Sequence, residues 1–320
     1  MIIQRSVSLK NYSNYKIGGI AEYFLEVTSA KELKEGLKQW HKMALTDIPE
    51  PFLLAAGTKI LIADDGYKGL VIHNKILGIN RDGEGVTVGS GVAMFDLLEF
   101  CIENSLSGLE WAGGLPGTIG GAVRGNAGAF KGETKDVVAS VNSINIKTLK
   151  ITTRLRADCN FGYRNSFFKD KEGRDEIITD VSLRLTKGVV AEIIRKTDEP
   201  KEFRKNDHPM RYPSLGSTFK NIPYNSLPQV LKDQFKDVTK SDPFPILPVA
   251  KLLVLSDLKG IRVGNAQISE KQPNFIVNLG NAKANDVKAL IKLAKDKVFK
   301  KFGVKIEEEI MYLGGDEYGR

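Results

Sequence analysis

Glycine is concentrated in one part of the chain, where it makes up seven of the sixteen residues from Gly113 to Gly128. Glycine adopts positive φ at little cost and lets the backbone approach a ligand with no Cβ in between. We therefore expect neither a packed helix nor a strand here, but main chain moulded onto a ligand, with N–H groups that suit phosphate oxygens. A flexible linker is the alternative, which the interleaved apolar residues and Pro116 disfavour. The spacing matches neither of the two commonest nucleotide-binding glycine loops.

Two other segments carry side chains suited to polar chemistry. Arg164 offers a planar, permanently charged fork that can hold a carboxylate. Ser217 follows Gly216 and can present a hydroxyl proton, but a serine hydroxyl is a poor acid unless its surroundings support proton loss. No Ser/His/Asp set accompanies Ser217, so covalent acyl transfer is not indicated. Taken alone, the arginine also fits a surface ion pair and the serine a turn cap.

The composition is that of an ordinary globular protein. The chain has 320 residues, 42% of them apolar, which is enough for two or three compact domains. The two cysteines, Cys101 and Cys159, form no C-x-x-C pair, and with three histidines the sequence offers no zinc-like ligand set, so we expect no metal. The N-terminal residues lack the apolar core of a signal peptide, and no run approaches the about 18 apolar residues that span a bilayer. A cytoplasmic protein without a membrane partner is expected.

The net charge of +8 favours anionic partners. The lysines are dispersed rather than gathered in a stripe with aromatic residues between them, so we expect no nucleic acid partner. Most of the charge fits solvated helix faces, such as residues 288–301. A small anionic ligand agrees with this distribution.

Apolar periodicity and capping residues predict three helices. Ser29 and Glu32 form a capping pair in front of a helical apolar face. Apolar residues at helical spacing predict two further helices, over about 94–103 and 286–302, the second ending at Gly303.

Short runs of β-branched and apolar residues predict strands, of which 86–89 and 181–185 are the clearest. The charged stretch 196–205, which contains Pro200, has the composition of a linker.

Four motifs occur in one order, and together they are far more specific than any one of them. They are Gly125–Ala129, Phe161–Lys169, Pro213–Asn221, and Gly303–Ile310 followed by Gly314. In these residues the chain resembles the UDP-N-acetylenolpyruvoylglucosamine reductases, flavoenzymes that make UDP-N-acetylmuramate for peptidoglycan. The resemblance covers nearly the whole chain, from Asn14 to Gly314.

The resemblance implies a reaction in two halves on one FAD. NADPH reduces the flavin and leaves, and UDP-N-acetylglucosamine enolpyruvate then enters. Hydride passes from flavin N5 to the vinyl CH₂ carbon, which leaves negative charge on the carbon that bears the carboxylate. In the family the residue matching Ser217 protonates that carbon, and the counterparts of Arg164 and Glu309 assist in the same step.

The resemblance also implies the fold and its division into domains. The fold is expected to be α+β, with a two-part FAD-binding region of the vanillyl-alcohol-oxidase/PCMH type and a third α+β domain that binds the substrate. We expect FAD-binding subdomain 1 over residues 1–75, subdomain 2 with the glycine loop over 76–198, and the substrate-binding domain over 199–320. The last strand, around 306–313, is expected to return Glu309 to the active site. A monomer is expected.

Further site residues follow from the same resemblance. Non-covalent FAD is expected on two loops, made of Ala55, Ala56, Gly57, Thr58, Lys59, Ile60 and Leu61, and of Gly113, Pro116, Gly117, Thr118, Gly120, Gly121, Asn126, Ala127 and Gly128. The residues expected at the nucleotide-sugar substrate are Tyr163, Lys220, Asn221 and Gln272.

The first FAD loop departs from the family's usual Gly-Gly-Gly-Ser-Asn-Leu-Leu. Ala55 and Ala56 stand in place of two glycines, whereas Thr58 keeps a hydroxyl. Lys59 adds a cation that could pair with the pyrophosphate, so we expect altered contacts to the flavin nucleotide.

The interval between Arg164 and Ser217 is short. The family's first type carries an inserted loop there, with a tyrosine that closes over the substrate, and this chain resembles the second type, which lacks that loop. Gln272 and Pro273 replace a more usual His-Ala, and Met311 stands where some members have arginine.

Two alternatives stay open at the level of the sequence. One is another enzyme of the same flavin fold, such as an oxidase of a sugar or hydroxy acid, although no histidine or cysteine that could tether FAD lies in the glycine loop. The other is a nucleotide-sugar or flavin binding protein without catalysis. Arg164, Ser217 and Glu309 argue against it, and the altered first loop keeps it open.

Overall fold

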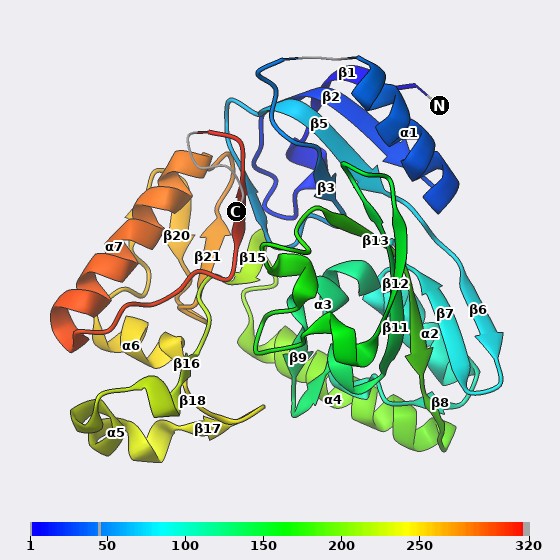
Figure 1. Cartoon of the computed structure of the whole chain (residues 1–320). Helices are drawn as coiled ribbons and strands as arrows, with labels where there is room; N and C mark the ends of the chain where they lie inside the picture. The colour runs from blue at the N-terminus through cyan, green and yellow to red at the C-terminus, as the bar shows by residue number, and fades with distance from the viewer. Residues whose placement is uncertain (1, 44–45, 316–320) are drawn as a thin grey trace. The chain divides into compact units, whose positions relative to one another are not determined.

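The computed structural model describes residues 2–43 and 46–315 and divides into two compact units. The first unit comprises the described residues of Met1–Val7, Ala21–Ala56 and Lys68–Glu202. The second comprises those of Ser8–Ile20, Gly57–Tyr67 and Phe203–Arg320. Both units mix helices and strands, so the expected α+β class is confirmed (Figure 1). The division into three domains at residues 75 and 198 stays a prediction.

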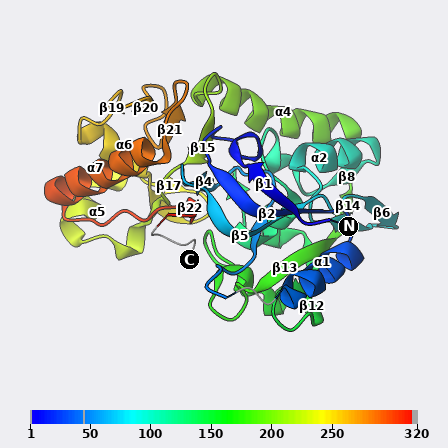
Figure 2. The ribbon, with the colours of Figure 1, turned by 90° about the horizontal axis from the view of Figure 1, so that it is seen from above.

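A four-stranded sheet in the first unit has the order β1-β2-β5-β3. Helix α1 lies against it (Figure 2). Buried apolar residues of the helix, such as Leu33 and Leu37, join strand residues in one cluster. The predicted cap is confirmed, since Ser29 Oγ accepts a hydrogen bond from the backbone N–H of Glu32 at 3.2 Å. The Glu32 carboxylate accepts from the backbone N–H of Thr28 at 2.7 Å. These elements are β1 Gln4–Ser8, β2 Ile20–Val27, α1 Ala30–Lys42, β3 Phe52–Leu54 and β5 Tyr67–Asn74.

A five-stranded antiparallel sheet, β12-β11-β13-β7-β6, belongs to the first unit together with helix α2, helix α3 (Ile119–Gly125) and helix α4 (Val190–Asp207) as far as Glu202. Helix α2 has the bounds predicted from the sequence, and strands β7 and β13 confirm the two predicted strands. The elements are β6 Ile79–Asp82, β7 Gly85–Gly89, α2 Met94–Glu103, β8 Leu106–Ser107, β10 Gly132–Glu133, β11 Val138–Asn145, β12 Ile151–Leu155, β13 Glu176–Arg184 and β14 Thr186–Lys187.

The expectation that the glycine segment contains no helix and no strand is wrong. Helix α3 runs over Ile119–Gly125, and Gly128 and Ala129 form the short strand β9. Thr118 caps the helix, because its hydroxyl accepts from the backbone N–H of Gly121 at 3.3 Å. Gly120 lets the helix approach Ser90 closely, since a Cβ at Gly120 would lie 2.8 Å from the Ser90 carbonyl oxygen. Here glycine serves close packing of a helix as well as a turn.

The prediction of a linker at 196–205 is also wrong, because these residues belong to helix α4, Val190–Asp207. Its buried residues are Ile193, Thr197, Pro200 and Arg204, which recur at helical spacing. Only Ile193 among them is a large apolar residue, so the helical period is hidden in the sequence. Burial lowers the pKa of Arg204 to about 10.

The second unit is built on the sheet β15-β21-β20-β19, and helix α7 packs against its strands β19 and β20. Helix α7 begins at Ala284, two residues before the predicted start, and ends as predicted at Gly303, which has a left-handed φ of 69°. The elements are β4 Ile60–Ile62, β15 Ser214–Ser217, β16 Ile222–Pro223, α5 Gln229–Phe235, β17 Lys240–Ser241, β18 Pro245–Leu247, α6 Val249–Leu255, β19 Arg262–Val263, β20 Ala266–Ile268, β21 Phe275–Asn278, α7 Ala284–Phe302 and β22 Met311–Leu313.

The predicted last strand, around 306–313, is shorter than expected. Strand β22 covers Met311–Leu313 and pairs in parallel with β4. The residues before it form an isolated antiparallel bridge between Glu308 and Phe219.

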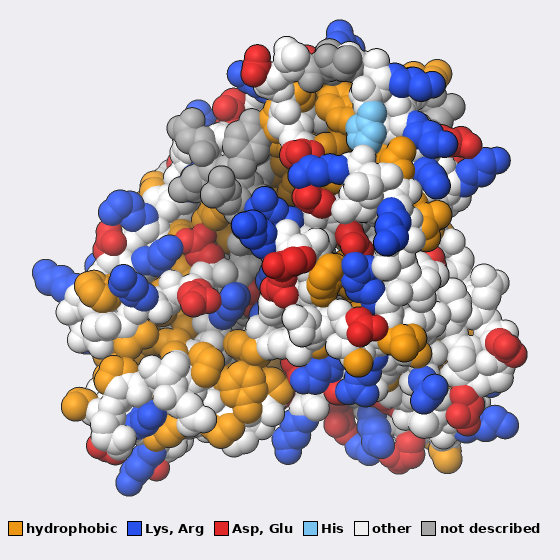
Figure 3. Space-filling view, in the orientation of Figure 1, with side chains coloured by type: hydrophobic (Ala, Val, Ile, Leu, Met, Phe, Trp, Pro, Cys, Tyr) orange, Lys and Arg blue, Asp and Glu red, His pale blue; other side chains and the backbone are white. Residues whose placement is uncertain are grey.

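The described part of the chain has no helix with the length and apolarity needed to cross a membrane. Within the same residues, no group of three or more histidine, cysteine, aspartate or glutamate side chains could hold a metal ion. On the face drawn in Figure 3, lysine and arginine side chains are interspersed with acidic ones and do not form one continuous stripe.

Candidate active site

In the first unit, Arg164 occupies a strained corner of a tight turn. Gly162 and Asn165 exchange backbone hydrogen bonds of 3.0 and 3.2 Å, which leaves Tyr163 and Arg164 at the tip. Arg164 has φ of +53°, a left-handed conformation that costs a non-glycine residue about 1–3 kcal/mol. Such strain persists only where neighbouring contacts hold it, and it concentrates at functional sites.

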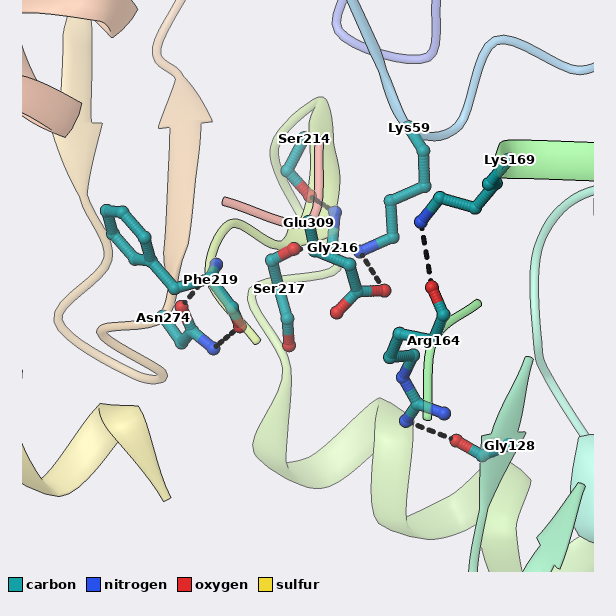
Figure 4. Close-up of polar contacts among 10 residues, drawn as sticks. All are labelled: Lys59, Gly128, Arg164, Lys169, Ser214, Gly216, Ser217, Phe219, Asn274 and Glu309. Carbon is teal, nitrogen blue, oxygen red and sulfur yellow. Dashed lines mark hydrogen bonds and ion pairs between the residues drawn. The ribbon is translucent and has the colours of Figure 1, made fainter. Parts of the chain in front are cut away.

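Two contacts hold Arg164 in this conformation. Its Nη2 donates to the carbonyl oxygen of Gly128 at 2.6 Å, and its own carbonyl oxygen accepts from Lys169 Nζ at 2.8 Å (Figure 4). The guanidinium carbon lies 5.2 Å from the centre of the Tyr163 ring. The end of the glycine segment therefore orients the guanidinium group, and Lys169 fixes the main chain that carries it.

Asn126 joins the first two motifs. Its Nδ2 donates to the carbonyl oxygen of Gly162 at 2.9 Å and to Glu133 Oε1 at 3.1 Å, while its Oδ1 accepts from the backbone N–H of Lys135 at 3.1 Å. Asn126 is fully buried and has φ of 40°, which asparagine tolerates better than most residues. These contacts hold the glycine segment against the turn of Arg164.

The glycine segment offers backbone donors. Gly114 and Gly117 have φ of +70° and +116°, and Gly114 is exposed. In the described part of the chain, the backbone N–H groups of Gly114, Gly117 and Thr118 donate to no protein acceptor. Donors gathered on a turn of this kind fit the phosphate oxygens of a dinucleotide. The segment thus fits the expected FAD.

In the second unit, Ser217 ends strand β15, which pairs with β21. The register pairs Ser214 with Val277 and Ser217 with Phe275, so this strand bulges between them, and Gly216 takes φ of +72°. Ser217 is half-buried. The bulge and the glycine turn the chain at the residue before the serine, which re-aims the side chain out of the regular pleat.

The Asn274 side chain fixes the backbone just after Ser217. Its Oδ1 accepts from the N–H of Phe219 at 3.0 Å and its Nδ2 donates to the carbonyl oxygen of Phe219 at 2.9 Å. The N–H of Thr218 donates to the Asn274 carbonyl oxygen at 2.7 Å. Asn274 is buried, so these bonds are shielded from water.

Glu309 reaches the neighbourhood of Ser217 through main-chain pairing. The N–H of Glu309 donates to the carbonyl oxygen of Thr218 at 2.8 Å, and the N–H of Lys220 donates to that of Glu307 at 2.9 Å. Glu309 is therefore held beside Ser217 by short antiparallel pairing, although strand β22 itself begins only at Met311.

Lys59 connects these two residues. Its Nζ donates to the carbonyl oxygen of Ser217 at 2.7 Å and forms an ion pair with Glu309 Oε1 at 3.1 Å (Figure 4). A contact of Lys59 with the flavin pyrophosphate stays a prediction. The described contacts of its ammonium group are with Ser217 and Glu309.

The other expected substrate residues have these contacts within the protein. Lys220 Nζ pairs with Glu307 Oε2 at 3.2 Å, and Asn221 Oδ1 accepts from the N–H of Val249 at the start of α6. Gln272 Oε1 accepts from the N–H of Asn274 at 3.3 Å. Their roles toward a substrate stay predictions.

The rest of the first FAD loop turns sharply at Gly57. This glycine has φ of +62°, and a Cβ there would lie 2.1 Å from the Tyr12 carbonyl oxygen. No larger residue fits, which explains why glycine is kept here while Ala55 and Ala56 replace the two before it.

Sequence reasoning missed the contributions of Lys169 and Asn274. Lys169 ends the motif Phe161–Lys169, and Asn274 begins the run Asn274–Asn278, which also matches the family pattern, so the resemblance was the signal that could have pointed to both. Their partners are main-chain atoms, which a pattern of residue types does not reveal.

Comparison with known proteins decides the family. A model of the UDP-N-acetylenolpyruvoylglucosamine reductase C-terminal domain matches residues 208–313, and a model described as FAD binding domain matches residues 21–148. The chain is 36% identical to UDP-N-acetylenolpyruvoylglucosamine reductase of Caldicellulosiruptor bescii, over 96% of this chain and 89% of that protein. The chain belongs to the UDP-N-acetylenolpyruvoylglucosamine reductase family.

Other members of this reductase family are similar over the same length. The chain is 32% identical to UDP-N-acetylenolpyruvoylglucosamine reductase 2 of Bacillus cereus, with 98% of this chain and 94% of that protein covered. A crystal structure of the reductase from Thermus caldophilus superposes with a TM-score of 0.74 at 30% identity, covering 98% of this chain and all of that one. The resemblance inferred from the four motifs is thus confirmed, as is the assignment to the FAD-dependent oxidoreductases.

Proposed function

We propose that this member of the reductase family uses NADPH to reduce UDP-N-acetylglucosamine enolpyruvate to UDP-N-acetylmuramate, in the synthesis of peptidoglycan precursors. The observation that carries the proposal is the pairing of Glu309 with Thr218, which holds a carboxylate beside the hydroxyl-bearing Ser217. The names of the relatives supply the substrate class.

FAD fits the glycine segment through the backbone N–H groups of Gly114, Gly117 and Thr118, none of which has a protein acceptor in the described residues. When bound, FAD supplies a two-electron carrier that takes hydride from NADPH and passes it to the vinyl carbon of the substrate. Non-covalent binding agrees with the sequence, since no histidine or cysteine lies between Gly113 and Gly128.

Ser217 is proposed as the proton donor to the carbon next to the substrate carboxylate. In this step the serine O–H bond breaks, a C–H bond forms, and the serine oxygen regains a proton from solvent or from a neighbouring acid. Glu309 is proposed to assist as an acid–base group, because its main chain pairs with Thr218, the residue after Ser217.

Arg164 is proposed to hold the substrate carboxylate and to stabilise the negative charge that develops next to it. A guanidinium group fixed by Gly128 and carried on a strained turn is oriented before the charge appears, which is the condition for effective electrostatic stabilisation. Tyr163, Lys220, Asn221 and Gln272 are proposed to contact the nucleotide sugar. A cytoplasmic location and a monomeric state remain predictions.

Absorbance spectroscopy of the purified protein tests this function. We expect a yellow protein whose colour acid precipitation releases as FAD, whose flavin absorbance NADPH bleaches, and whose absorbance returns on anaerobic addition of UDP-N-acetylglucosamine enolpyruvate. A protein that binds FMN instead, keeps its flavin on the washed pellet, or is not reoxidised by this compound would contradict the proposal. Reoxidation by oxygen alone would favour the oxidase alternative.

A further inference from the structure

The Lys59 ammonium group contacts the two residues proposed for proton delivery. It lies 2.7 Å from the carbonyl oxygen of Ser217 and 3.1 Å from Glu309 Oε1. The Lys59 side chain is 36% exposed and that of Glu309 is 19% exposed. An ammonium group carries three donors, so it can serve the carbonyl and the carboxylate at the same time.

The main chain of Lys59 is anchored to the segment that carries Glu309. The N–H of Met311, two residues after Glu309, donates to the carbonyl oxygen of Lys59 at 2.8 Å. The ammonium group also lies close to Gly216, the residue before Ser217, since a Cβ at Gly216 would be in ordinary van der Waals contact with Lys59 Nζ at 3.7 Å. Lys59 is therefore held at its backbone and at its tip.

The sequence position makes this lysine notable. It stands in a loop whose usual family pattern has asparagine at this place, and asparagine has neither the charge nor the length to make both contacts in the same way. A partly exposed ion pair such as this one contributes little to stability by itself. The contact matters for position rather than for stability, because the same ammonium group binds both the Glu309 carboxylate and the carbonyl oxygen of Ser217.

Resting on the function proposed above, we infer that Lys59 is a positioning residue for the protonation step. It holds the Glu309 carboxylate and the Ser217 main chain in the arrangement in which the serine proton is delivered. If Lys59 instead contacts the flavin pyrophosphate, as the sequence predicts, its replacement should weaken the binding of FAD.

Lys59→Met separates the two roles, because it keeps the aliphatic stem and removes the ammonium group. At saturating FAD we expect reoxidation by UDP-N-acetylglucosamine enolpyruvate, followed by stopped-flow absorbance, to slow about 10- to 100-fold, as for a misplaced catalytic group. Flavin reduction by NADPH and the dissociation constant of FAD should stay within about twofold of the parent, a margin below 1 kcal/mol. Lys59→Arg, which keeps the charge, should restore most of the reoxidation rate.

Lys295→Met is the matched control. Lys295 pairs with Glu308, the neighbour of Glu309, at 2.8 Å, so this variant removes an equivalent ion pair on the same segment. Its two half-reactions should match those of the parent. Lys59→Met should slow the Glu309→Gln variant by a smaller factor than it slows the parent, because the part of its effect that acts through the Glu309 carboxylate is already removed and only the contact with the Ser217 carbonyl is lost.

The inference is overturned if Lys59→Met reoxidises as fast as the parent, if it weakens FAD binding without slowing reoxidation, or if Lys295→Met slows reoxidation equally. If Lys59→Met does not fold, the same measurements are made on Lys59→Gln, because glutamine keeps a hydrogen-bond donor and loses the positive charge. A parent protein that the enolpyruvyl compound does not reoxidise would instead contradict the proposed function, and the two failures are thus distinguishable.

Discussion

The carboxamide of Asn274 makes both of its hydrogen bonds to the backbone of one residue, Phe219, at 3.0 and 2.9 Å. Phe219 follows Ser217 by two residues and forms the bridge to Glu308. A single buried side chain thus fixes the main chain on which both proposed proton-transfer residues depend.

Asn274→Leu should therefore affect stability and catalysis together. It leaves the N–H and the carbonyl of Phe219 without their buried partner, which costs about 1–3 kcal/mol per unsatisfied group. We expect a lower melting temperature and slower reoxidation by the enolpyruvyl substrate, with NADPH reduction retained. Asn274→Asp keeps the acceptor and loses the donor, so its melting temperature should fall between those of the leucine variant and the parent. Unchanged stability in both variants would contradict the role given to Asn274.

Arg164→Ala should slow reoxidation much more than flavin reduction, because the charge that Arg164 is proposed to stabilise appears only on the substrate. The loss of one oriented electrostatic donor typically lowers the rate about 100- to 1,000-fold. Single-turnover measurements of each half-reaction make the comparison. Equal slowing of both halves would point to a folding defect or a shared positioning role.

The sequence predicted those elements in which apolar residues follow the period of the backbone, as in helices α2 and α7. It failed for α4, whose buried stripe includes Thr197, Pro200 and Arg204, and for α3, where glycine serves close packing against Ser90. In both cases tertiary packing overrides the local signal.

The candidate site was predicted unevenly for a related reason. Arg164, Ser217 and Glu309 lie in motifs that mark the family, so the sequence singled them out. The contact of Lys59 with Ser217 joins residues 158 positions apart, and nothing in the local sequence of either residue indicates it. Main-chain partners, such as that of Asn274, are equally invisible in a pattern of side chains.

Gly113→Ala should weaken FAD binding by displacing the glycine segment. A Cβ at Gly113 would lie 1.9 Å from the Thr197 carbonyl oxygen, so the loop or helix α4 must move. We expect the dissociation constant of FAD, measured by quenching of flavin fluorescence, to rise at least about tenfold, which corresponds to 1.4 kcal/mol.

Gly125→Ala is the control for the added methyl group, because a Cβ there meets no described protein atom within 4 Å. Its melting temperature as apoprotein should match the parent. If Gly113→Ala binds FAD as tightly as the parent, the close packing of Gly113 against Thr197 is not needed for the glycine segment to bind FAD.

Alkaline pH should destabilise the protein through its buried thiols. Burial raises the pKa of Cys101 to about 12 from an ordinary value near 9. Above pH 9 the unfolded chain loses this proton while the folded chain keeps it, so the free energy of unfolding falls as pH rises toward 12. By pH 10.5 the contribution of Cys101 amounts to about 2 kcal/mol. Between pH 8 and 10.5, denaturant titrations should show a smaller decline in the free energy of unfolding for Cys101→Ala than for the parent. Equal declines in the two proteins would contradict a raised pKa of Cys101.

Ser217→Ala tests most directly whether Ser217 donates the proton, because only reoxidation by the substrate needs that proton and flavin reduction by NADPH does not. Substrate affinity should change little, since one hydroxyl contributes about 0.5–1.5 kcal/mol to a typical hydrogen bond. Stopped-flow absorbance of the flavin, run separately for each half-reaction, should show NADPH reduction at nearly the parent rate and reoxidation by UDP-N-acetylglucosamine enolpyruvate slowed by several orders of magnitude. If the alanine variant is reoxidised as fast as the parent, Ser217 is only a turn residue and does not donate the proton.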